Sequence, residues 1–407
     1  MADGRALSRF AGVRRLSEAL PSRLILADHL LKDGVGHHLG YNIALADAAV
    51  RRGMGVEIVS SREFDPGLAP GVSARRLFRR DYRAEPPMWV ARNHRLLTLL
   101  ERWCDWRFRA DLGRLRGVGP EDAIFAQMIA PRHFRRWVEW LAASGSRAVL
   151  FLHLGYRPER FGTLRTEIER LEEDVRRRLV FITDSEKLVE PFGRALGYRV
   201  HYLPHVISYP LASNVAKAAG VTIYQAGNAR REKGFAEVVE AVRRILESGN
   251  PGGLRFVLQC NHPDSVAVEI LRDRPCSGPF LEWIDRAQSN AEYIRRLASA
   301  DVVLLPYHSD LYVARTSGIF CECRVLGKPV VASRGTWAGD RVARDGGGWL
   351  VGERNVGELT AILQRIPEER EAVTAAARAL APAARAEFHR DALMERLVKL
   401  WREARGV

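Results

Sequence analysis

The segment from Asp301 to Gly335 constrains the fold of this chain more than any other. A short apolar run, Val302 to Leu305, is followed by a polar loop, a helix-like segment that begins near Thr316, and a second apolar run, Val330 to Ala332. Strand, loop, helix and strand in this order form the unit from which parallel sheets are built. Because ligands bind at the carboxyl ends of strands in such sheets, the loop after Pro306 is a candidate site.

The helix start within this segment carries groups suited to a phosphorylated ligand. The hydroxyl and backbone N–H groups of Ser317, Gly318 and Ile319 lie where an anionic phosphate is favoured. Glu322 follows about one turn later, and from there its carboxylate is placed to accept hydrogen bonds from a ribose diol. Phosphate donors combined with a ribose acceptor predict a nucleotide site.

A second strand, turn and helix follow one another earlier in the chain, and a glycine and a lysine lie in the turn. A strand from Val221 to Gln225 precedes Gly227, and Lys233 stands six residues after that glycine, just before a helix expected over residues 236–247. The ammonium then lies at the mouth of the sheet and at the positive end of the helix, which favours a diphosphate. A solvated lysine in a basic loop is the alternative, but the placement of strand, turn and helix argues for a phosphate site.

Together these motifs resemble retaining glycosyltransferases of the GT-B fold, family 4 type. The run from Glu322 to Val331 is similar to the second half of their E-x7-E region, in which the second Glu holds the ribose of the nucleotide. The first Glu of that region would fall at Ala314. Lys233 matches the lysine of their G-R-x-x-x-x-K-G pattern, whereas Asn228 occupies the place of its arginine.

The resemblance implies an α/β protein with two Rossmann-like parallel-sheet domains that face each other across a cleft. We expect an acceptor-side domain over residues 1–207, a nucleotide-sugar domain over 208–385 and a helix over 386–407 that crosses back to the first domain. The implied reaction moves a sugar from a nucleotide-diphosphate sugar to a saccharide or lipid-linked acceptor, with retention, in bacterial polysaccharide or glycolipid assembly. A catalytically silent scaffold, and a nucleotide-sugar epimerase or phosphorylase, are the alternatives.

The motifs and the resemblance nominate individual site residues. The expected catalytic residues are His153, Lys233 and Arg315. Donor contacts are expected from Gly36, Asn228, Arg231, Lys233, Ser317, Gly318, Ile319 and Glu322, with Arg230 as an alternative to Arg231. The acceptor-side candidates are His37, His38, Asp310 and Tyr312. Tyr312, Arg315 and Asp310 are also candidates to replace the missing glutamate, and for His153 an ordinary histidine at a strand end is the alternative.

The length and composition agree with two domains. A chain of 407 residues exceeds what one hydrophobic core usually supports. No apolar run approaches the ~20 residues that span a bilayer, and no signal-peptide core precedes Arg23, so we expect a cytoplasmic protein. The five cysteines lack C-x-x-C spacing and are expected to be buried, neither paired nor bound to zinc.

The formal charge of +14 indicates either an anionic partner or an arginine-rich composition. No nucleic-acid-binding motif is present, which argues against nucleic acid. Arginines and aromatic residues mix at helical spacing over residues 74–118 and again over residues 132–141. Such helices either lie on an anionic membrane surface, here the inner face of the plasma membrane, or pack one face in the domain and leave their arginines solvated.

The absence of a D-x-D motif predicts a site without a metal or another cofactor. The leaving diphosphate would then be neutralised by Lys233, the nearby arginines and the N–H groups of residues 317–319. At the end of the chain, two long helices are expected, over residues 356–365 and 368–405.

Overall fold

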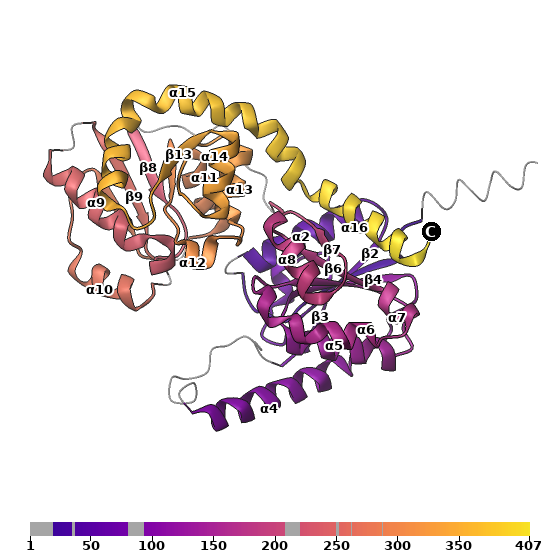
Figure 1. Cartoon of the computed structure of the whole chain (residues 1–407). Coiled ribbons are helices and arrows are strands. Elements are labelled where there is room, and N and C mark those ends of the chain that lie inside the picture. Colours follow the sequence, from indigo (N-terminus) through magenta and orange to yellow (C-terminus); the bar gives the residue numbers. More distant parts are fainter. Residues whose placement is uncertain are drawn as a thin grey trace, which may run out of the picture. The chain divides into compact units, whose positions relative to one another are not determined.

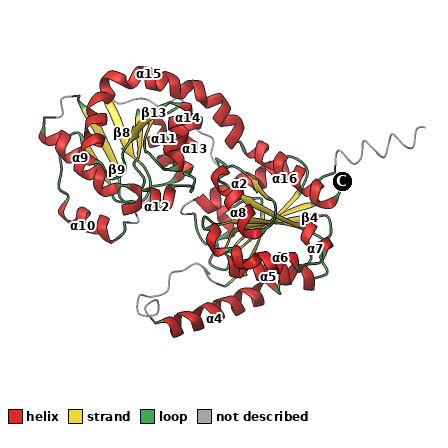
Figure 2. Ribbon diagram, in the orientation of Figure 1, coloured by secondary structure: helices red, strands yellow, loops and turns green. Residues whose placement is uncertain are grey.

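The computed structural model describes residues 19–34, 37–79, 93–207, 220–249, 252–261, 263–286 and 288–407. Its contacts divide the chain into two compact units, one formed by Met1–Ser208 with Arg390–Val407 and the other by Tyr209–His389. Each unit is built on one parallel sheet flanked by helices (Figures 1 and 2). The prediction of two Rossmann-like α/β domains is confirmed.

The described part of the first unit contains a seven-stranded sheet in the order β3-β2-β1-β4-β5-β6-β7. Its strands are β1 Arg23–Asp28, β2 Gly55–Ser61, β3 Ser73–Phe78, β4 Asp122–Ile129, β5 Val149–Leu154, β6 Leu179–Thr183 and β7 Val200–Tyr202. Its helices are α2 His37–Val50, α4 His94–Leu112, α5 Pro131–Ala143, α6 Arg165–Glu169, α7 Glu173–Arg177, α8 Glu186–Leu196 and α16 Arg390–Arg405, with 3-10 turns η1 Pro66–Leu68, η2 Pro158–Arg160 and η3 Gly162–Leu164.

Helices cover this sheet because its strands are apolar on both faces. Strands β4 and β5 are buried along their whole length, as is typical of parallel sheets with two covered faces. On one face, Leu45 of α2 packs in the same core as Leu397 and Trp401 of α16. The last helix of the chain therefore completes the core of the first unit.

The described part of the second unit contains a six-stranded sheet in the order β10-β9-β8-β11-β12-β13. Its strands are β8 Val221–Gln225, β9 Leu254–Gln259, β10 Leu281–Ile284, β11 Val302–Leu305, β12 Val330–Ser333 and β13 Gly348–Val351. Its helices are α9 Phe235–Glu247, α10 Ser265–Asp273, α11 Asn290–Ser299, α12 Ser309–Tyr312, α13 Gly318–Leu326, α14 Trp337–Asp345 and α15 Val356–Phe388, with the 3-10 turn η4 Arg231–Lys233.

Two helix boundaries differ from the prediction. Helix α13 begins at Gly318 because the Ser317 hydroxyl accepts a hydrogen bond from the N–H of Phe320 at 3.2 Å and caps the helix. Helix α15 continues through Pro367, so the break predicted after residue 365 is wrong. The buried Ile366 holds the helix in the core of its unit across that proline, and the chain leaves the helix at His389.

The two basic aromatic segments differ in burial. In α5, Phe134, Trp137 and Trp140 are all buried, so the membrane interpretation of this helix is wrong and it packs as an ordinary helix. Helix α4 instead leaves Trp103 and Trp106 exposed. Two further aromatic residues of that stretch, Tyr82 and Trp89, lie outside the described residues.

Two predictions from composition can be compared with the structure. All five cysteines are buried, as predicted, and none of them forms a disulfide. Within the described ranges, no helix combines the length and the apolar character needed to cross a membrane.

Candidate functional site

The turn after β8 folds the Lys233 side chain back over Gly227. The backbone of Gly227 has a φ of +93°, and a β-carbon built there would lie 2.8 Å from Lys233 Nζ and 2.9 Å from Ile319 Cδ1. Only glycine, which has no β-carbon, leaves room for these two side chains and adopts this φ without strain. The turn therefore brings together the predicted lysine and the first turn of α13.

The end of β11 supports the same loop. Gly234 has a φ of +69°, and a β-carbon there would lie 2.2 Å from the carbonyl oxygen of Pro306. Lys233 Nζ lies 5.8 Å from the centroid of the Tyr307 ring, within cation–π range. The ammonium thus occupies the carboxyl ends of β8 and β11, which are neighbours in the sheet.

Several positive groups gather around this lysine. Burial, and then the charges of Arg315 and Arg230, lower the pKa of the Lys233 ammonium to about 8. Arg315 stacks over the ring of Tyr312, with 5.3 Å between Cζ and the ring centroid. Glu232 opposes this shift only in part, so a buried ammonium next to two arginines suits a multiply charged anion.

The first turn of α13 adds neutral donors beside these cations. The N–H groups of Gly318 and Ile319 belong to the first turn of the helix and so have no intrahelical acceptor. Contact between Ile319 and the Gly227 turn fixes this helix start next to Lys233. Backbone donors at a helix start are a common way to bind phosphate.

Glu322 is buried one turn further along α13. Its Oε2 atom accepts a hydrogen bond from the Tyr293 hydroxyl of α11 at 2.5 Å. Burial raises the pKa of the Glu322 carboxyl to about 7, against the opposing effect of that hydrogen bond. The carboxyl is therefore held by a residue that the sequence motifs did not include.

A chain of polar contacts lies at the carboxyl ends of β8 and β9. The Tyr224 hydroxyl and the N–H of Gly227 both donate to Gln259 Oε1, at 2.8 and 2.9 Å. Gln288 donates to the Tyr224 hydroxyl at 3.2 Å. Motif matching missed these residues, although polar side chains at the ends of buried strands are a signal of such a site.

The remaining donor-side candidates are Asn228, Arg231 and its alternative Arg230. Asn228 Oδ1 accepts a hydrogen bond from the Asn261 amide at 3.3 Å, next to the Gly227 turn. Arg231 is exposed, and its backbone N–H donates to Asp264. Of the two arginines considered for the diphosphate, only Arg230 acts on the pKa of Lys233.

The exposed Asp310 lies in a polar cluster with the half-buried Glu353 and the buried His308. Ligand atoms of His308, Asp310 and Glu353 lie within 4.8 Å of one another, the only such group among the described residues. Arg354 pairs with Asp310 at 3.2 Å and with Glu353 at 3.5 Å. Because a cation already balances these carboxylates, the cluster forms a local salt-bridge network.

In the first unit, His38 belongs to a polar network at the ends of β1 and β4. Its Nδ1 lies 2.9 Å from Asp28 Oδ2, which also accepts from Asn42 at 2.9 Å, and Gln127 donates to Asn42. Burial alone would raise the pKa of Asp28, but His38, with smaller contributions from His29 and Asn42, outweighs it and the pKa falls to about 2. Next to Gln127, Met128 has a φ of +51°, a strained conformation typical of functional sites.

A second polar group lies at the ends of β5 and β6. His153 is buried there, and Tyr156 donates to Asp184 at 2.8 Å. Burial lowers the pKa of His205, with the charges of Asp184 and His153 acting on the same ring. Ser185 occupies the N-cap position of helix α8 without a side-chain cap hydrogen bond, and Asp184 belongs to this polar group.

Two candidates of the first loop cannot be placed. Gly36 and the side chain of His37 lie outside the described residues.

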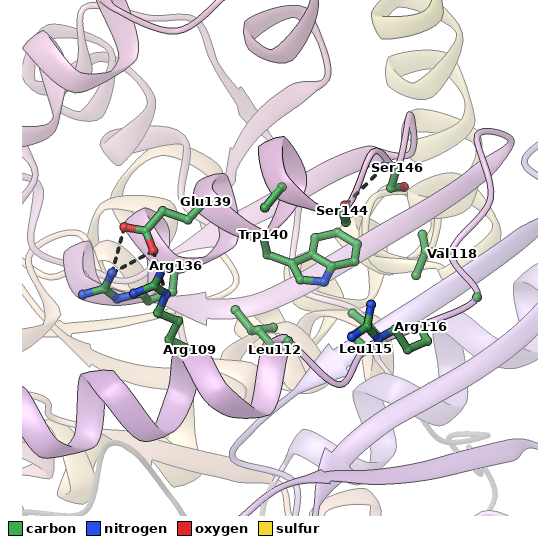
Figure 3. Close-up of a pocket in the computed structure, with 13 residues that line it drawn as sticks. Arg109, Leu112, Leu115, Arg116, Val118, Arg136, Glu139, Trp140, Ser144 and Ser146 are labelled. Atoms are coloured by element: carbon green, nitrogen blue, oxygen red, sulfur yellow. Dashed lines mark hydrogen bonds and ion pairs between the residues drawn. The ribbon is translucent and has the colours of Figure 1, made fainter.

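A pocket of the first unit lies at the opposite end of its strands from these polar groups (Figure 3). It has a volume of about 290 Å³ and lies between the last turns of α4 and α5, lined by Arg109, Arg136, Glu139 and Trp140 among others. Residues 116–118 and 146 of its wall precede β4 and β5, at the amino ends of these strands. Ligands of parallel sheets bind at the carboxyl ends, so this pocket is separate from the sites above.

Known structures resemble the whole chain. Sucrose-phosphate synthase from Thermosynechococcus elongatus matches with a TM-score of 0.65 at 15% identity, over 95% of this chain and 99% of that chain. Anabaena HepE in complex with UDP and glucose matches with a TM-score of 0.60 at 12% identity, over 92% and 98%. The trehalose-6-phosphate synthase OtsA matches with a TM-score of 0.63 at 14% identity, over 93% and 99%.

These likenesses are structural. No protein-family model matches the sequence, and no curated protein matches it. At 12 to 15% identity the comparisons show the fold, and the chain has the GT-B fold of these proteins.

Proposed function

We propose that this chain is a glycosyltransferase that takes its sugar from a nucleotide-diphosphate sugar. The observation that carries the proposal is the Lys233 ammonium, folded over Gly227 with Arg315 and the start of α13 around it. A diphosphate would neutralise these cations and accept the N–H groups of the helix start. The fold supports this assignment, since Anabaena HepE has been solved with UDP-glucose.

Glu322 is the proposed partner of the nucleotide ribose. Its carboxyl lies on the same helix as the phosphate donors, one turn further on, and Tyr293 holds one of its oxygens. A carboxylate restrained in this way accepts hydrogen bonds from a diol with little loss of side-chain freedom.

We further propose that transfer proceeds with retention, as in the family 4 enzymes that the motifs resemble, and without a metal. The bond between the anomeric carbon and the diphosphate oxygen breaks, and the acceptor oxygen bonds to the same face of the sugar. The acceptor proton passes to the departing phosphate oxygen. Lys233, Arg315 and the helix start stabilise the charge that develops on the diphosphate.

The acceptor is proposed to be a saccharide or a lipid-linked saccharide of bacterial polysaccharide or glycolipid assembly, bound by the first unit. Two polar groups at the carboxyl ends of its strands support this assignment, one around His38 and Asp28 and one around His153 and Asp184. Hydroxyl-rich ligands need such paired donors and acceptors. With a lipid-linked acceptor, the protein would work at the inner face of the plasma membrane.

Thermal unfolding with UDP, GDP, ADP and their sugar conjugates, without added metal, tests the donor site. A ligand at about 100-fold over its Kd stabilises the folded protein by roughly 2.7 kcal/mol. We expect one nucleotide to raise the melting temperature of the wild type but not of Lys233→Ala or Glu322→Ala. If no nucleotide has an effect, the chain is a silent scaffold.

The fate of the sugar distinguishes the remaining alternatives. A transferase passes it from the responding donor to an acceptor hydroxyl and releases the nucleoside diphosphate. Release that requires inorganic phosphate would identify a phosphorylase, and a change of sugar stereochemistry without transfer would identify an epimerase. The anomeric configuration of the product, measured by NMR, tests retention.

A further inference from the structure

Helix α4 of the first unit has two apolar faces. The inner face contains the buried Cys104, Phe108 and Leu112, and Phe108 stacks on Phe78 of β3 with 5.5 Å between ring centroids. The outer face carries Leu96, Leu99, Trp103 and Trp106, which are 37%, 60%, 40% and 59% exposed. Their spacing of three, four and three residues places them in one line along the helix. We call these four residues the outer stripe.

Among the described residues of its unit, no packing contact accounts for the outer stripe. A surface helix normally presents one apolar face to the core and polar residues to solvent. Here α4 already packs against α5 and β3 through its inner face. A continuous line of exposed leucine and tryptophan on a folded helix indicates an interaction surface.

Arginines border the outer stripe on both sides. By helical spacing, Arg95, Arg102 and Arg109 follow one border, and Arg107 follows the other with its guanidinium 4.8 Å from the Trp103 ring. The acids of α4 are directed elsewhere, since Asp105 pairs with Arg136 and Asp111 with Arg79. Glu101 falls roughly 180° around the helix from the centre of the outer stripe.

From this arrangement we infer that the outer stripe of α4 docks on an anionic lipid surface. Tryptophan and leucine enter the boundary between headgroups and acyl chains, while the bordering arginines contact the anionic headgroups. A second copy of this chain fits the surface poorly, because two stripes would bring their arginine borders together in a protein of net charge +14.

Binding of the full-length protein to vesicles tests the inference. We expect it to float with vesicles of equal parts phosphatidylcholine and phosphatidylglycerol and to stay in solution with phosphatidylcholine alone. Salt raised from ~0.1 M to ~1 M shortens the screening length from about 10 Å to about 3 Å and should weaken the binding. Equal binding to both kinds of vesicle, or no binding to either, would overturn the inference.

Variants identify the surface. Leu99→Gln with Trp106→Gln should lower partitioning by more than about tenfold through lost apolar burial. Arg95→Gln with Arg102→Gln should lower it by roughly 25-fold, because each arginine near an anionic surface contributes about fivefold. Matched controls are Val50→Gln with Val268→Gln, and Arg177→Gln with Arg272→Gln, which change exposed residues outside α4 and should bind as the wild type does.

Two further measurements make the outcome decisive. All variants should unfold at the wild-type temperature, because the changed side chains are exposed. Sedimentation without lipid tests whether a second copy of the chain covers the outer stripe. A wild-type dimer that becomes a monomer in Leu99→Gln with Trp106→Gln would overturn the lipid assignment. Vesicle binding is measured without nucleotide, so its outcome is independent of the proposed donor site.

Discussion

The ammonium of Lys233 lies within 2.8 Å of the position that a β-carbon on Gly227 would occupy. The positions of the glycine and the lysine, six residues apart, therefore depend on each other. The glycine makes room for the cation, and the cation is held at the end of β8 where the pKa of its ammonium falls to about 8.

Gly227→Ala should both destabilise the protein and abolish the nucleotide response. The new methyl group meets Lys233 Nζ and Ile319, and alanine is strained at a φ of +93°. Gly249 is a matched control, since its φ is +84° with nothing within 4 Å. In urea unfolding we expect Gly249→Ala to cost about 1 kcal/mol from backbone strain alone, and Gly227→Ala about 2 kcal/mol or more. Equal costs and an intact nucleotide response would contradict the role of Gly227.

Lys233→Ala should lower kcat/KM for the donor by about 100-fold or more, because loss of one charge-stabilising donor costs about 3 kcal/mol in other enzymes. Lys399→Ala removes an exposed lysine of α16 and should leave the rate unchanged. Steady-state kinetics over a range of donor concentrations measures the effect. A value of kcat/KM within twofold of the wild type would show that Lys233 does not contribute to the donor site.

The depressed pKa of Lys233 predicts a dependence of stability on pH. The ammonium has a pKa of about 8 in the folded protein and 10.5 without the fold, so between these values the unfolded chain binds more protons. Its contribution to the free energy of unfolding therefore rises as the pH increases from 8 to 10.5, and nucleotide affinity falls over the same range. Lys233→Met should remove that part of the slope and stabilise the nucleotide-free protein at pH 7 by roughly 2 kcal/mol.

The control for this measurement is Lys399→Met, which should retain the wild-type slope. Urea unfolding at several pH values, without nucleotide, gives both slopes. An unchanged slope in Lys233→Met would show that the ammonium is not desolvated.

Tyr293→Phe should weaken nucleotide binding most near pH 7. The Tyr293 hydroxyl opposes the rise of the Glu322 pKa to about 7, so its loss raises that pKa further and leaves more of the carboxyl protonated. Isothermal titration with the responding nucleotide should show a deficit relative to wild type that shrinks as the pH rises to 9. A deficit independent of pH would assign Tyr293 a packing role only.

Ionisation of Glu322 lowers the stability of the folded protein, whereas ionisation of a carboxylate in an ion pair raises it. Its folded pKa of about 7 lies above the unfolded 4.5, so the folded state binds more protons between these values and stability falls as the pH rises through that range. Glu322→Gln should remove this fall and be more stable than the wild type at pH 8, by ~1–3 kcal/mol. Equal stability of the two proteins at pH 8 would contradict a buried carboxylate.

Asp28→Asn should destabilise the first unit at neutral pH. Asp28 has a pKa of about 2 in the folded protein and 3.8 without the fold, so its stabilisation is fully present above 3.8 and is lost as the pH falls through 2. The expected cost is roughly 2 kcal/mol in urea at pH 7. Glu63→Gln removes an exposed carboxylate of the same unit and should cost little.

Much of the fold could be predicted from local sequence patterns. The buried strands β8, β11 and β12 read as short apolar runs, and Gly227, Lys233 and Ser317 mark the turn and helix starts between them. The prediction failed at Pro367, because proline normally ends a helix whereas here the buried Ile366 maintains it. Packing that spans distant segments outweighed the local signal.

The two α/β units, the turn with Gly227 and Lys233 and the start of helix α13 could be predicted from the sequence, because each depends on residues close together in the chain. Only the tertiary structure decided which polar side chains meet. Tyr293 reaches Glu322 from another helix, and Gln259 joins the Gly227 turn from another strand. It also decided that α5 is buried while the outer stripe of α4 is exposed, because the two helices have similar compositions and burial depends on the elements that pack against them.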